Sequence, residues 1–394
     1  MIWSLQGGES PIHTIQRNPR VTGLSCIRCG VLYREGDLFT GCPACLKKGY
    51  PSSLKVEYAS DMVRENDGDG RSMMRYGKWL PYCRFPTLGE GDTPLLDFPR
   101  LADQLGVASF QIKDEGQNPT GSHKDRFSPL MVGRAMESGA GTLVVASSGN
   151  AGLSVASYAA FNGLGCVVIS QENLNEGLRR AIQGTGAELI LMKHPLERWH
   201  TMRRLVEEKG YFPATNYIKP PVGSNPYGVQ GYKTIAYEIC EQGGGEVPNV
   251  VLVPTSRADL LWGIKEGFHE RMRAGRMRHL PRLVAVEPIP RLTAVLAGED
   301  YRKAFTDGRT PLRSIGGNTV TWQGVAALRE TKGCAMVIEM EEAQVAQSDL
   351  LRQGLYLESS SATVLAAARR LVAQEWIRTE EQVIAIGTSH AWKW

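Results

Sequence analysis

Long apolar runs, strong net charge and a basic start followed by an apolar stretch are all missing from this sequence. None of its apolar runs reaches the ~20 residues that a membrane-spanning helix needs, so we expect no membrane span. The first residues, Met1 to Gln6, show no basic start followed by an apolar stretch, which argues against export and predicts a cytoplasmic protein. A net charge of +4 over 394 residues gives a weak field and predicts neither a nucleic-acid nor a membrane partner.

Positive charge is concentrated in only one short stretch. Because the arginines there precede a proline, we interpret them as the solvated face of a helix that ends near Pro281, and not as a nucleic-acid site. The stretch contains Arg271, Arg273, Arg276, Arg278 and Arg282.

Cysteine is sparse except in two Cys-x2-Cys pairs that are twelve residues apart. This spacing lets four thiolates converge on one zinc ion, although a rubredoxin-like iron site, two disulfides and a redox dithiol are alternatives. Four closed ligands in a reducing compartment favour structural zinc. We therefore expect a small zinc ribbon at residues 20–55, whose metal orders a segment too short to build its own core. The four expected ligands are Cys26, Cys29, Cys42 and Cys45.

Short apolar strands alternate with helical periods from about residue 110 onward. This alternation predicts parallel sheets covered by helices on both faces, with ligands beyond the carboxyl ends of the strands. Strands are expected at 110–113, 143–146, 167–170, 188–192, 250–253, 283–286, 335–339 and 383–386. Helices are expected to begin near residues 126, 150, 176, 196, 228, 258, 341 and 361.

Two segments carry residues suited to chemistry. In the first, the turn-forming run Asn118-Pro119-Thr120-Gly121-Ser122 precedes Lys124 and a helical run, so the Lys124 amine is held at the mouth of a helix, as imine chemistry requires. The second, residues 147–152, follows an apolar strand and opens a helix. Its backbone N–H groups and small hydroxyls suit a carboxylate or a phosphate.

Together with Leu88-Gly89-Glu90-Gly91-Asp92-Thr93-Pro94-Leu95-Leu96, these segments resemble the threonine synthase family of pyridoxal-phosphate (PLP) enzymes. The wider fold includes serine and threonine dehydratases and the tryptophan synthase β chain. The resemblance implies an α/β protein with two doubly wound parallel-sheet lobes beside the zinc ribbon, acting as a PLP-dependent lyase on an amino acid, and a homodimer. We expect residues 56–118 and 220–394 to form the larger, PLP-binding lobe, and residues 119–219 the smaller lobe.

The resemblance also implies roles for individual residues. Lys124 would form the Schiff base with PLP and, once freed, move the α proton. Asn150 would contact the phenolic oxygen of PLP, and Thr388 its pyridine nitrogen. The plainer alternatives are a helix N-cap for Asn150 and a local backbone contact for the Thr388 hydroxyl. The substrate carboxylate is expected on Ser147, Ser148, Gly149 and Ala151.

The sequence departs from the family where the phosphate of PLP should bind. The segment Pro254-Thr255-Ser256-Arg257-Ala258-Asp259-Leu260 contains no glycine, so its backbone cannot wrap a phosphate closely. Thr255, Ser256 and the charge of Arg257 could still hold a dianion. His123 resembles the histidine that helps to bind this phosphate in the tryptophan synthase β chain. We therefore expect Arg257 and His123 to replace the glycine cradle.

A further departure concerns the substrate. Threonine synthases contact the substrate phosphate partly through an arginine after an Asn-Pro-Tyr segment, whereas here Gly228 follows Asn225-Pro226-Tyr227. O-phosphohomoserine, giving threonine, is the leading substrate. A serine/threonine dehydratase and a β-replacement synthase of a specialised pathway are the alternatives within this chemistry. An inactive regulatory relative and a zinc-ribbon interaction protein are alternatives of another class.

Overall fold

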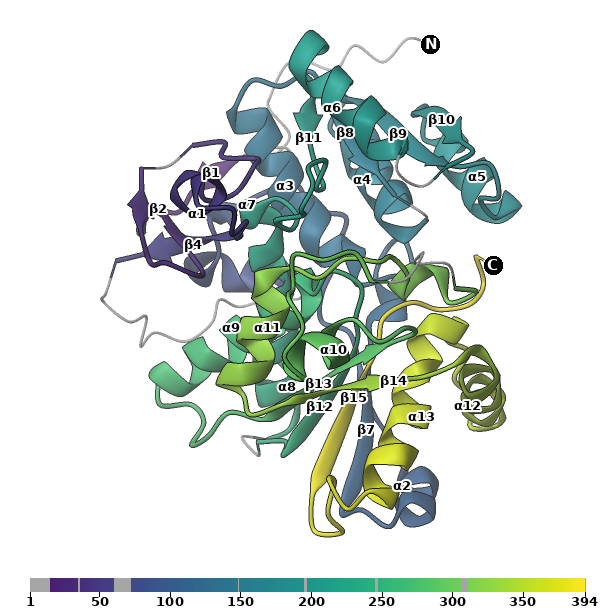
Figure 1. Ribbon diagram of the computed structural model, residues 1–394. Coiled ribbons are helices and arrows are strands. Elements are labelled where there is room, and N and C mark those ends of the chain that lie inside the picture. Colours follow the sequence, from purple (N-terminus) through teal and green to yellow (C-terminus); the bar gives the residue numbers. More distant parts are fainter. Residues whose placement is uncertain are drawn as a thin grey trace, which may run out of the picture.

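The computed structural model describes residues 15–34, 36–59, 72–147, 149–194, 197–244, 247–305 and 310–393. Two sheets with covering helices lie one above the other, and a small antiparallel module lies beside α3 and α7 (Figure 1). The start of the chain, from which we predicted no export, lies outside the described residues. Ser148, expected to bind the substrate carboxylate, also lies outside them.

The small module contains the two cysteine pairs. Its three-stranded antiparallel sheet has the order β3-β2-β4. Its core is shared with the rest of the protein, because Leu24 and Val56 belong to the same buried cluster as Tyr76, Trp79 and Tyr237. The elements are β2 (Val21–Cys26), β3 (Leu32–Tyr33), α1 (Pro43–Lys47) and β4 (Leu54–Tyr58), followed by the 3-10 helix η2 (Met73–Trp79) and by β5 (Tyr82–Arg84), which pairs with β1 (Gln16–Arg17).

The upper sheet is entirely parallel, with the order β10-β9-β8-β11. Its three longer strands confirm the strands predicted at 143–146, 167–170 and 188–192, whereas the short strand β11 was not predicted from the sequence. The strands are β8 (Thr142–Ala146), β9 (Gly165–Gln171), β10 (Glu188–Met192) and β11 (Phe212–Pro213). The helices are α4 (Asn150–Phe161), α5 (Glu176–Gly184) and α6 (Glu197–Lys209).

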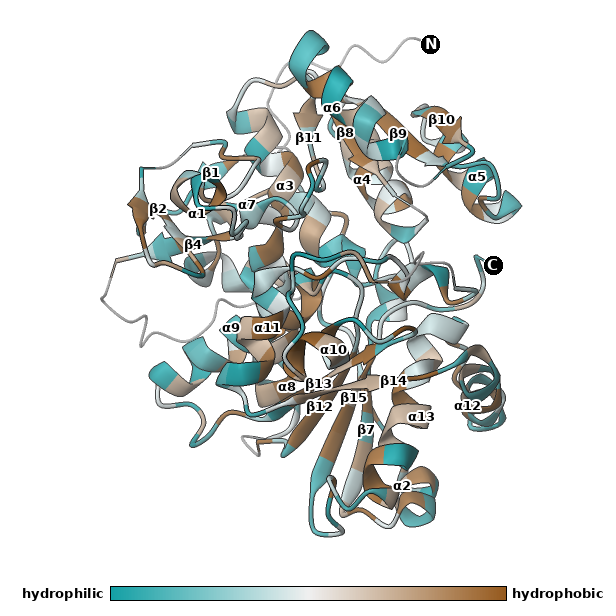
Figure 2. Cartoon of the chain, viewed as in Figure 1, coloured by the Kyte–Doolittle hydropathy of each residue, from teal (hydrophilic) through white to brown (hydrophobic). Residues whose placement is uncertain are grey.

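The lower sheet has the order β14-β13-β12-β15-β7-β6. Its first five strands are parallel, as predicted, but β6 at the edge runs antiparallel to β7. Figure 2 shows β12, β13 and β15 largely in brown, as expected for strands buried on both faces. The strands are β6 (Leu95–Asp97), β7 (Ser109–Asp114), β12 (Val250–Pro254), β13 (Arg282–Glu287), β14 (Cys334–Val337) and β15 (Gln382–Gly387).

The remaining helices cover the lower sheet or connect the two sheets. Each predicted helix start lies within two residues of an observed one, but α2, α8, α10 and α11 were not predicted from the sequence. Within the described part of the chain, no helix is long and apolar enough to cross a membrane. The α-helices are α2 (Pro99–Leu105), α3 (Lys124–Glu137), α7 (Pro226–Val229), α8 (Lys233–Gln242), α9 (Asp259–Arg273), α10 (Leu292–Leu296), α11 (Trp322–Glu330), α12 (Met340–Arg352) and α13 (Ser359–Ala373); η3 (Glu115–Gln117), η4 (Gln230–Tyr232) and η5 (Arg313–Ile315) are 3-10 turns.

Two predictions about element ends are wrong. The strand predicted at 335–339 ends at Val337, because Glu339 and Glu342 form a capping box that starts α12. The arginine-rich helix ends at Arg273, before Gly275 takes a positive φ of 70°. Arg271 is also buried and not solvated. Its guanidinium lies 4.2 Å from the ring centre of Tyr237 and donates to Glu241 at 3.1 Å.

Candidate active site

Lys124 is the first residue of α3 and follows the turn at 118–122. Asp125 stabilises this turn, because its carboxylate accepts hydrogen bonds from the backbone N–H and the hydroxyl of Thr120, both at 2.6 Å. Gly121 completes the turn with a φ of 76°, a conformation that glycine adopts without steric cost. The local sequence therefore fixes the position of the lysine at the helix start.

The Lys124 amine is partly buried and donates to the Tyr232 hydroxyl at 3.3 Å. Burial lowers the pKa of Lys124 to about 8; Asp259 opposes this shift and Arg257 adds to it. A larger fraction of this amine is neutral near pH 7 than of an ordinary lysine, and a neutral amine is the nucleophilic form.

A buried cluster of four charged side chains anchors α3 to the lower sheet and to α8. The Arg126 guanidinium contacts Glu115 at 2.7 Å and Glu238 at 2.5 Å, and the Lys113 amine contacts Glu238 at 2.7 Å. All four side chains have no exposed surface. The cluster is electrically balanced, and it holds rigid the helix that carries Lys124.

His123 connects α3 to the end of β15. Its backbone N–H and its Nδ1 both bond the carbonyl oxygen of Thr388, at 2.9 and 3.0 Å. Burial holds the pKa of His123 well below its usual value, so the ring is neutral and carries its proton on Nδ1. A hydrogen bond from Nε2 to a phosphate would therefore require a second proton on this ring.

Asn150 is the first residue of α4 and lies between two groups of opposite charge. Its Oδ1 accepts a hydrogen bond from the Lys393 amine at 2.7 Å, and its Nδ2 donates to Glu358 at 3.2 Å. Ser147 acts as a cap for this helix, because its hydroxyl oxygen accepts from the N–H groups of Gly149 and Gly152 at 3.1 and 3.0 Å. The capping alternative thus applies to Ser147 and not to Asn150.

Thr388 follows β15, and its hydroxyl lies 2.5 Å from the hydroxyl of Ser361 in α13. Its carbonyl oxygen contacts His123, which precedes Lys124. Lys393 connects Asn150 to the turn before Lys124, since its amine also donates to the carbonyl oxygens of Thr120 and Gly121 at 2.9 and 3.0 Å. These contacts bring predicted residues from three distant parts of the sequence, His123 and Lys124, Asn150, and Thr388, into one site.

The hydroxyls expected to bind a phosphate are used within the protein. Thr255 donates to the carbonyl oxygen of Val253 at 2.7 Å, and Ser256 donates to that of Gly316 at 2.8 Å. Asp259 is likewise bonded, because its carboxylate accepts from Ser224 at 2.7 Å and from the Gln323 amide at 2.6 Å. These bonds hold the Asp259 carboxylate against Ser224 and Gln323.

Arg257 is the exception in this loop. In the described part of the chain its Nε is buried without a hydrogen-bond partner, and its guanidinium lies 5.5 Å from the ring centre of Trp199 in α6. Burial also lowers the pKa of Arg257 and lowers that of neighbouring Arg198 to about 10. Two partly buried cations near each other are an arrangement that an anion would stabilise.

Comparison with known proteins shows the family: the one described as "Pyridoxal-phosphate dependent enzyme" matches residues 86–389. The chain belongs to this family. It is 31% identical over 385 residues to threonine synthase of Methanosarcina acetivorans, covering 94% of this chain and 92% of the relative. Threonine synthase of Methanocaldococcus jannaschii is 29% identical over 386 residues, covering 93% and 92%. The enzyme is thus a PLP-dependent lyase, with relatives that match almost its whole length.

A solved structure shows the same fold at lower identity. The processed form of threonine deaminase isoform 2 from Solanum lycopersicum superposes with a TM-score of 0.65 and 22% identity, covering 76% of this chain and 84% of that chain.

The site of this PLP enzyme fits the cofactor. PLP combines an aldehyde with a phosphate dianion, and the site offers a partly buried lysine amine and a buried arginine nitrogen without a partner. In the same described region the Ser122 hydroxyl, two residues before Lys124, is also buried without a partner. The unused donors suit an anionic ligand.

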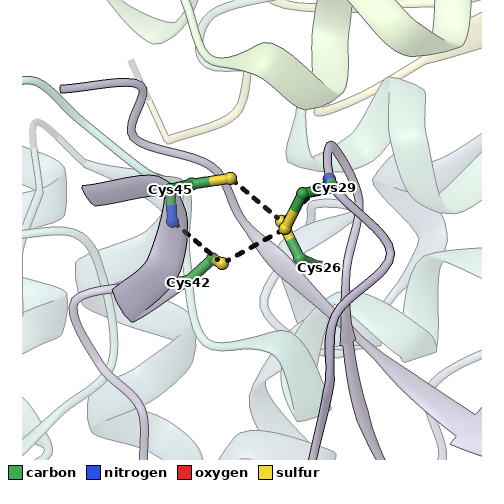
Figure 3. A group of neighbouring side chains, drawn as sticks. All are labelled: Cys26, Cys29, Cys42 and Cys45. Atoms are coloured by element: carbon green, nitrogen blue, oxygen red, sulfur yellow. Dashed lines mark hydrogen bonds between the residues drawn. The ribbon is translucent and has the colours of Figure 1, made fainter. Parts of the chain in front are cut away.

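The four cysteines of the small module converge, as Figure 3 shows. Their sulfur atoms all lie within 4.8 Å of one another, and the pairs Cys26/Cys45 and Cys29/Cys42 are each 3.7 Å apart. Ligands at a tetrahedral zinc with bonds of about 2.3 Å would be about 3.8 Å apart, whereas a disulfide requires about 2.05 Å. The cluster therefore has the dimensions of a metal site.

Three residues at the site were not predicted from the sequence: Tyr232, Glu358 and Lys393. Tyr232 is part of a helical run with no distinctive pattern, so nothing in the sequence indicates its contact with Lys124. For Lys393 and Glu358, the position in the sequence could have indicated a place near the site. The first lies five residues after Thr388, and the second precedes the helix α13, whose start faces the same region.

Proposed function

We propose that this enzyme catalyses elimination or replacement at Cβ or Cγ of an amino acid, with the conversion of O-phosphohomoserine to threonine as the leading reaction. The observation that carries the proposal is the partly buried Lys124 amine, with a pKa of about 8, held at the start of α3 against the Tyr232 hydroxyl. The two relatives above, which are named threonine synthase and match more than nine-tenths of the chain, support the leading reaction.

In the proposed site Lys124 binds the PLP aldehyde, Asn150 faces the phenolic oxygen and Thr388 the pyridine nitrogen. Arg257 binds the phosphate, and Thr255 and Ser256 join it only by exchanging the hydrogen bonds that they make within the protein, while His123 needs a second ring proton to do so. When bound, PLP supplies the electron sink that lets an α proton and then a leaving group depart. The free Lys124 amine takes up the α proton, and Tyr232 orients that amine. Because Thr388 offers a neutral hydroxyl instead of a carboxylate, the sink is moderate, which favours elimination or replacement over transamination.

The substrate carboxylate is proposed to bind at the start of α4, where Ser147, Ser148, Gly149 and Ala151 lie in sequence. The N–H groups in the first turn of a helix have no partners within that helix and carry a partial positive charge. A carboxylate bound there would lie next to Asn150, which orients the cofactor.

A second candidate function is the dehydration of serine or threonine. A Cβ at Gly228 would lie 2.5 Å from the Phe127 ring, so no side chain fits there, and an arginine is excluded by packing. Serine and threonine carry no phosphate and do not need that arginine. The packing at Gly228 is the observation that supports this second candidate.

The experiment that tests the proposed function starts from the visible spectrum of the purified protein. PLP held covalently on a lysine is yellow, and borohydride should bleach the colour and label Lys124. A panel of O-phosphohomoserine, O-phosphoserine, serine, threonine and O-acetylserine is then scored for ketoacid and for new amino acid. Threonine from O-phosphohomoserine supports the leading reaction, and ketoacid from serine or threonine supports the second. A protein that takes up no added PLP would contradict both.

Arg257→Ala is expected to weaken PLP binding roughly 10- to 100-fold, because it removes a charged hydrogen-bond donor for the phosphate. The measurement is an equilibrium titration of the apoprotein with PLP, followed by absorbance. Arg203→Ala is a suitable control. Arg203 lies on α6, its side chain is 47% exposed, and it forms an ion pair with the exposed Glu207 in this helix. An unchanged dissociation constant for Arg257→Ala would exclude this role.

We also propose that the cysteine cluster binds a structural zinc. Cys42→Ser is expected to lose most of its zinc and to lower the melting temperature by roughly 5 °C or more, because the metal orders a module whose core is shared with η2 and α8. Metal analysis and a thermal melt measure both effects. Cys83→Ser, outside the cluster, should keep its zinc. Full zinc occupancy in Cys42→Ser would contradict the assignment.

The lobe boundaries also remain a proposal. It is supported by the position of the strands, since β8 to β11 all lie within 119–219, while β6, β7 and β12 to β15 lie within 56–118 and 220–394. A homodimer in the cytoplasm likewise remains a prediction, and sedimentation of the purified protein would test the dimer.

A further inference from the structure

The segment that follows β15, residues 388–393, crosses the site instead of leading away from it. The Ser389 hydroxyl donates to the carbonyl oxygen of Gly121 at 3.0 Å, and the backbone of Ala391 donates to Tyr356 at 3.1 Å. In Figure 1 this segment runs from the lower sheet toward the helices of the upper sheet. Its last described residue, Lys393, therefore contacts both the turn before α3 and the start of α4.

The Lys393 amine has three acceptors, one for each of its protons. It donates to the carbonyl oxygens of Thr120 and Gly121 at 2.9 and 3.0 Å and to Oδ1 of Asn150 at 2.7 Å. All three acceptors are neutral, and the nearby carboxylates of Glu358 and Asp125 are bonded to Asn150 and Thr120 instead of to this amine. Burial lowers the pKa of Lys393 to about 8, while Glu358 and Asp125 raise it.

This contact determines which way the Asn150 amide faces. An amide has one accepting oxygen and one donating NH2 group, and an ammonium can only donate. Because Lys393 holds the oxygen, the NH2 group is directed elsewhere, and in this structure it donates to Glu358 at 3.2 Å. The same NH2 group is the one that must donate to an anionic phenolic oxygen.

We propose that Lys393 is a positioning residue that fixes the orientation of the Asn150 amide and places a positive charge beside the phenolic oxygen of bound PLP. The proposal rests on the proposed cofactor site. A nearby cation favours the ionised form of a phenol, so Lys393 opposes the Glu358 carboxylate, which contacts the NH2 group of Asn150 and favours the neutral form. It also ties the turn before Lys124 to the start of α4, so that both cofactor contacts are held at a fixed separation.

The test is Lys393→Met, which keeps an unbranched side chain one atom shorter and removes the charge and the three donors. Two properties of the PLP-loaded protein are measured: the dissociation constant for PLP, and the pH at which the absorbance of the bound cofactor changes. We expect roughly tenfold weaker binding and a midpoint that moves up by about one pH unit, because the ionised oxygen loses its cation. Thermal stability is recorded in parallel.

Trp392→Ala is the matched control within the same segment. Trp392 is 76% exposed and packs edge-on against Tyr356 at 5.0 Å, so its removal loosens the segment without touching Asn150. Its absorbance midpoint should equal that of the unchanged protein. If Lys393→Met only lowers thermal stability and the midpoint stays in place, the inference is wrong even though the cofactor site stands. If the unchanged protein binds no PLP, the proposed function itself fails.

Discussion

Lys124→Ala is expected to remain folded, to lose the yellow colour with PLP and to lose at least roughly 10³-fold in turnover. In the proposed mechanism the side chain supplies both the covalent attachment of PLP and the amine that moves the α proton. Among the described residues, this amine has a single hydrogen bond, to Tyr232. Removing this side chain should therefore abolish PLP attachment and turnover but lower the stability of the protein only slightly. Absorbance after incubation with PLP, a single-turnover assay and a thermal melt together measure these three effects.

Lys209→Ala is a matched control for this experiment, because Lys209 is an exposed lysine at the end of α6. It should keep both colour and turnover. A yellow Lys124→Ala protein that borohydride still reduces would show that another amine holds the cofactor. Lys393 would then be the first candidate, since Asn150 connects it to the same site.

Arg126→Met is expected to lower the free energy of unfolding by about 3–5 kcal/mol. The substitution leaves Glu115 and Glu238 buried together with only Lys113 to balance them, and an uncompensated buried charge is costly. Urea unfolding followed by fluorescence measures the change. Arg180→Met is the control. It removes an ion pair between Glu176 and Arg180, whose side chain is 78% exposed. It should change the free energy of unfolding by less than about 0.5 kcal/mol. Equal effects of the two substitutions would contradict a structural role of the cluster.

The same cluster predicts how stability changes in acid. Burial alone would raise the pKa of Glu238, but Arg126 and Lys113 outweigh it and lower this pKa to about 2. An unfolded glutamate has a pKa of about 4.3, so the folded state binds the proton less readily than the unfolded one. The stabilisation is complete above about pH 4.3 and is lost as the pH falls toward 2. In Arg126→Met this loss should be smaller, because the main cause of the lowered pKa is gone.

Local patterns in the sequence were sufficient for the parallel strands and for the position of Lys124. The conformation of the turn at 118–122 and of the strand before residue 147 depends mainly on neighbouring residues, and both were predicted. The end of the strand at 335–339 was missed, because the competing capping box of Glu339 and Glu342 starts a helix there.

Contacts between distant residues could not be predicted in this way. Lys393 meets Thr120 across 273 residues and Asn150 meets Glu358 across 208, and no periodicity encodes such pairs. The burial of Arg271 is similar, because it depends on Tyr237, which approaches from a different helix. A charged residue on a helix looks solvated until the packing partner of that helix is known.

The close packing of Gly228 under the Phe127 ring couples the two positions. A bulky residue at one position requires a small residue at the other, so an arginine at 228 requires a smaller side chain in place of the Phe127 ring. Replacing Phe127 first leaves a hole, and replacing Gly228 first produces a collision. A redesign of this part of the protein therefore has to change both positions together.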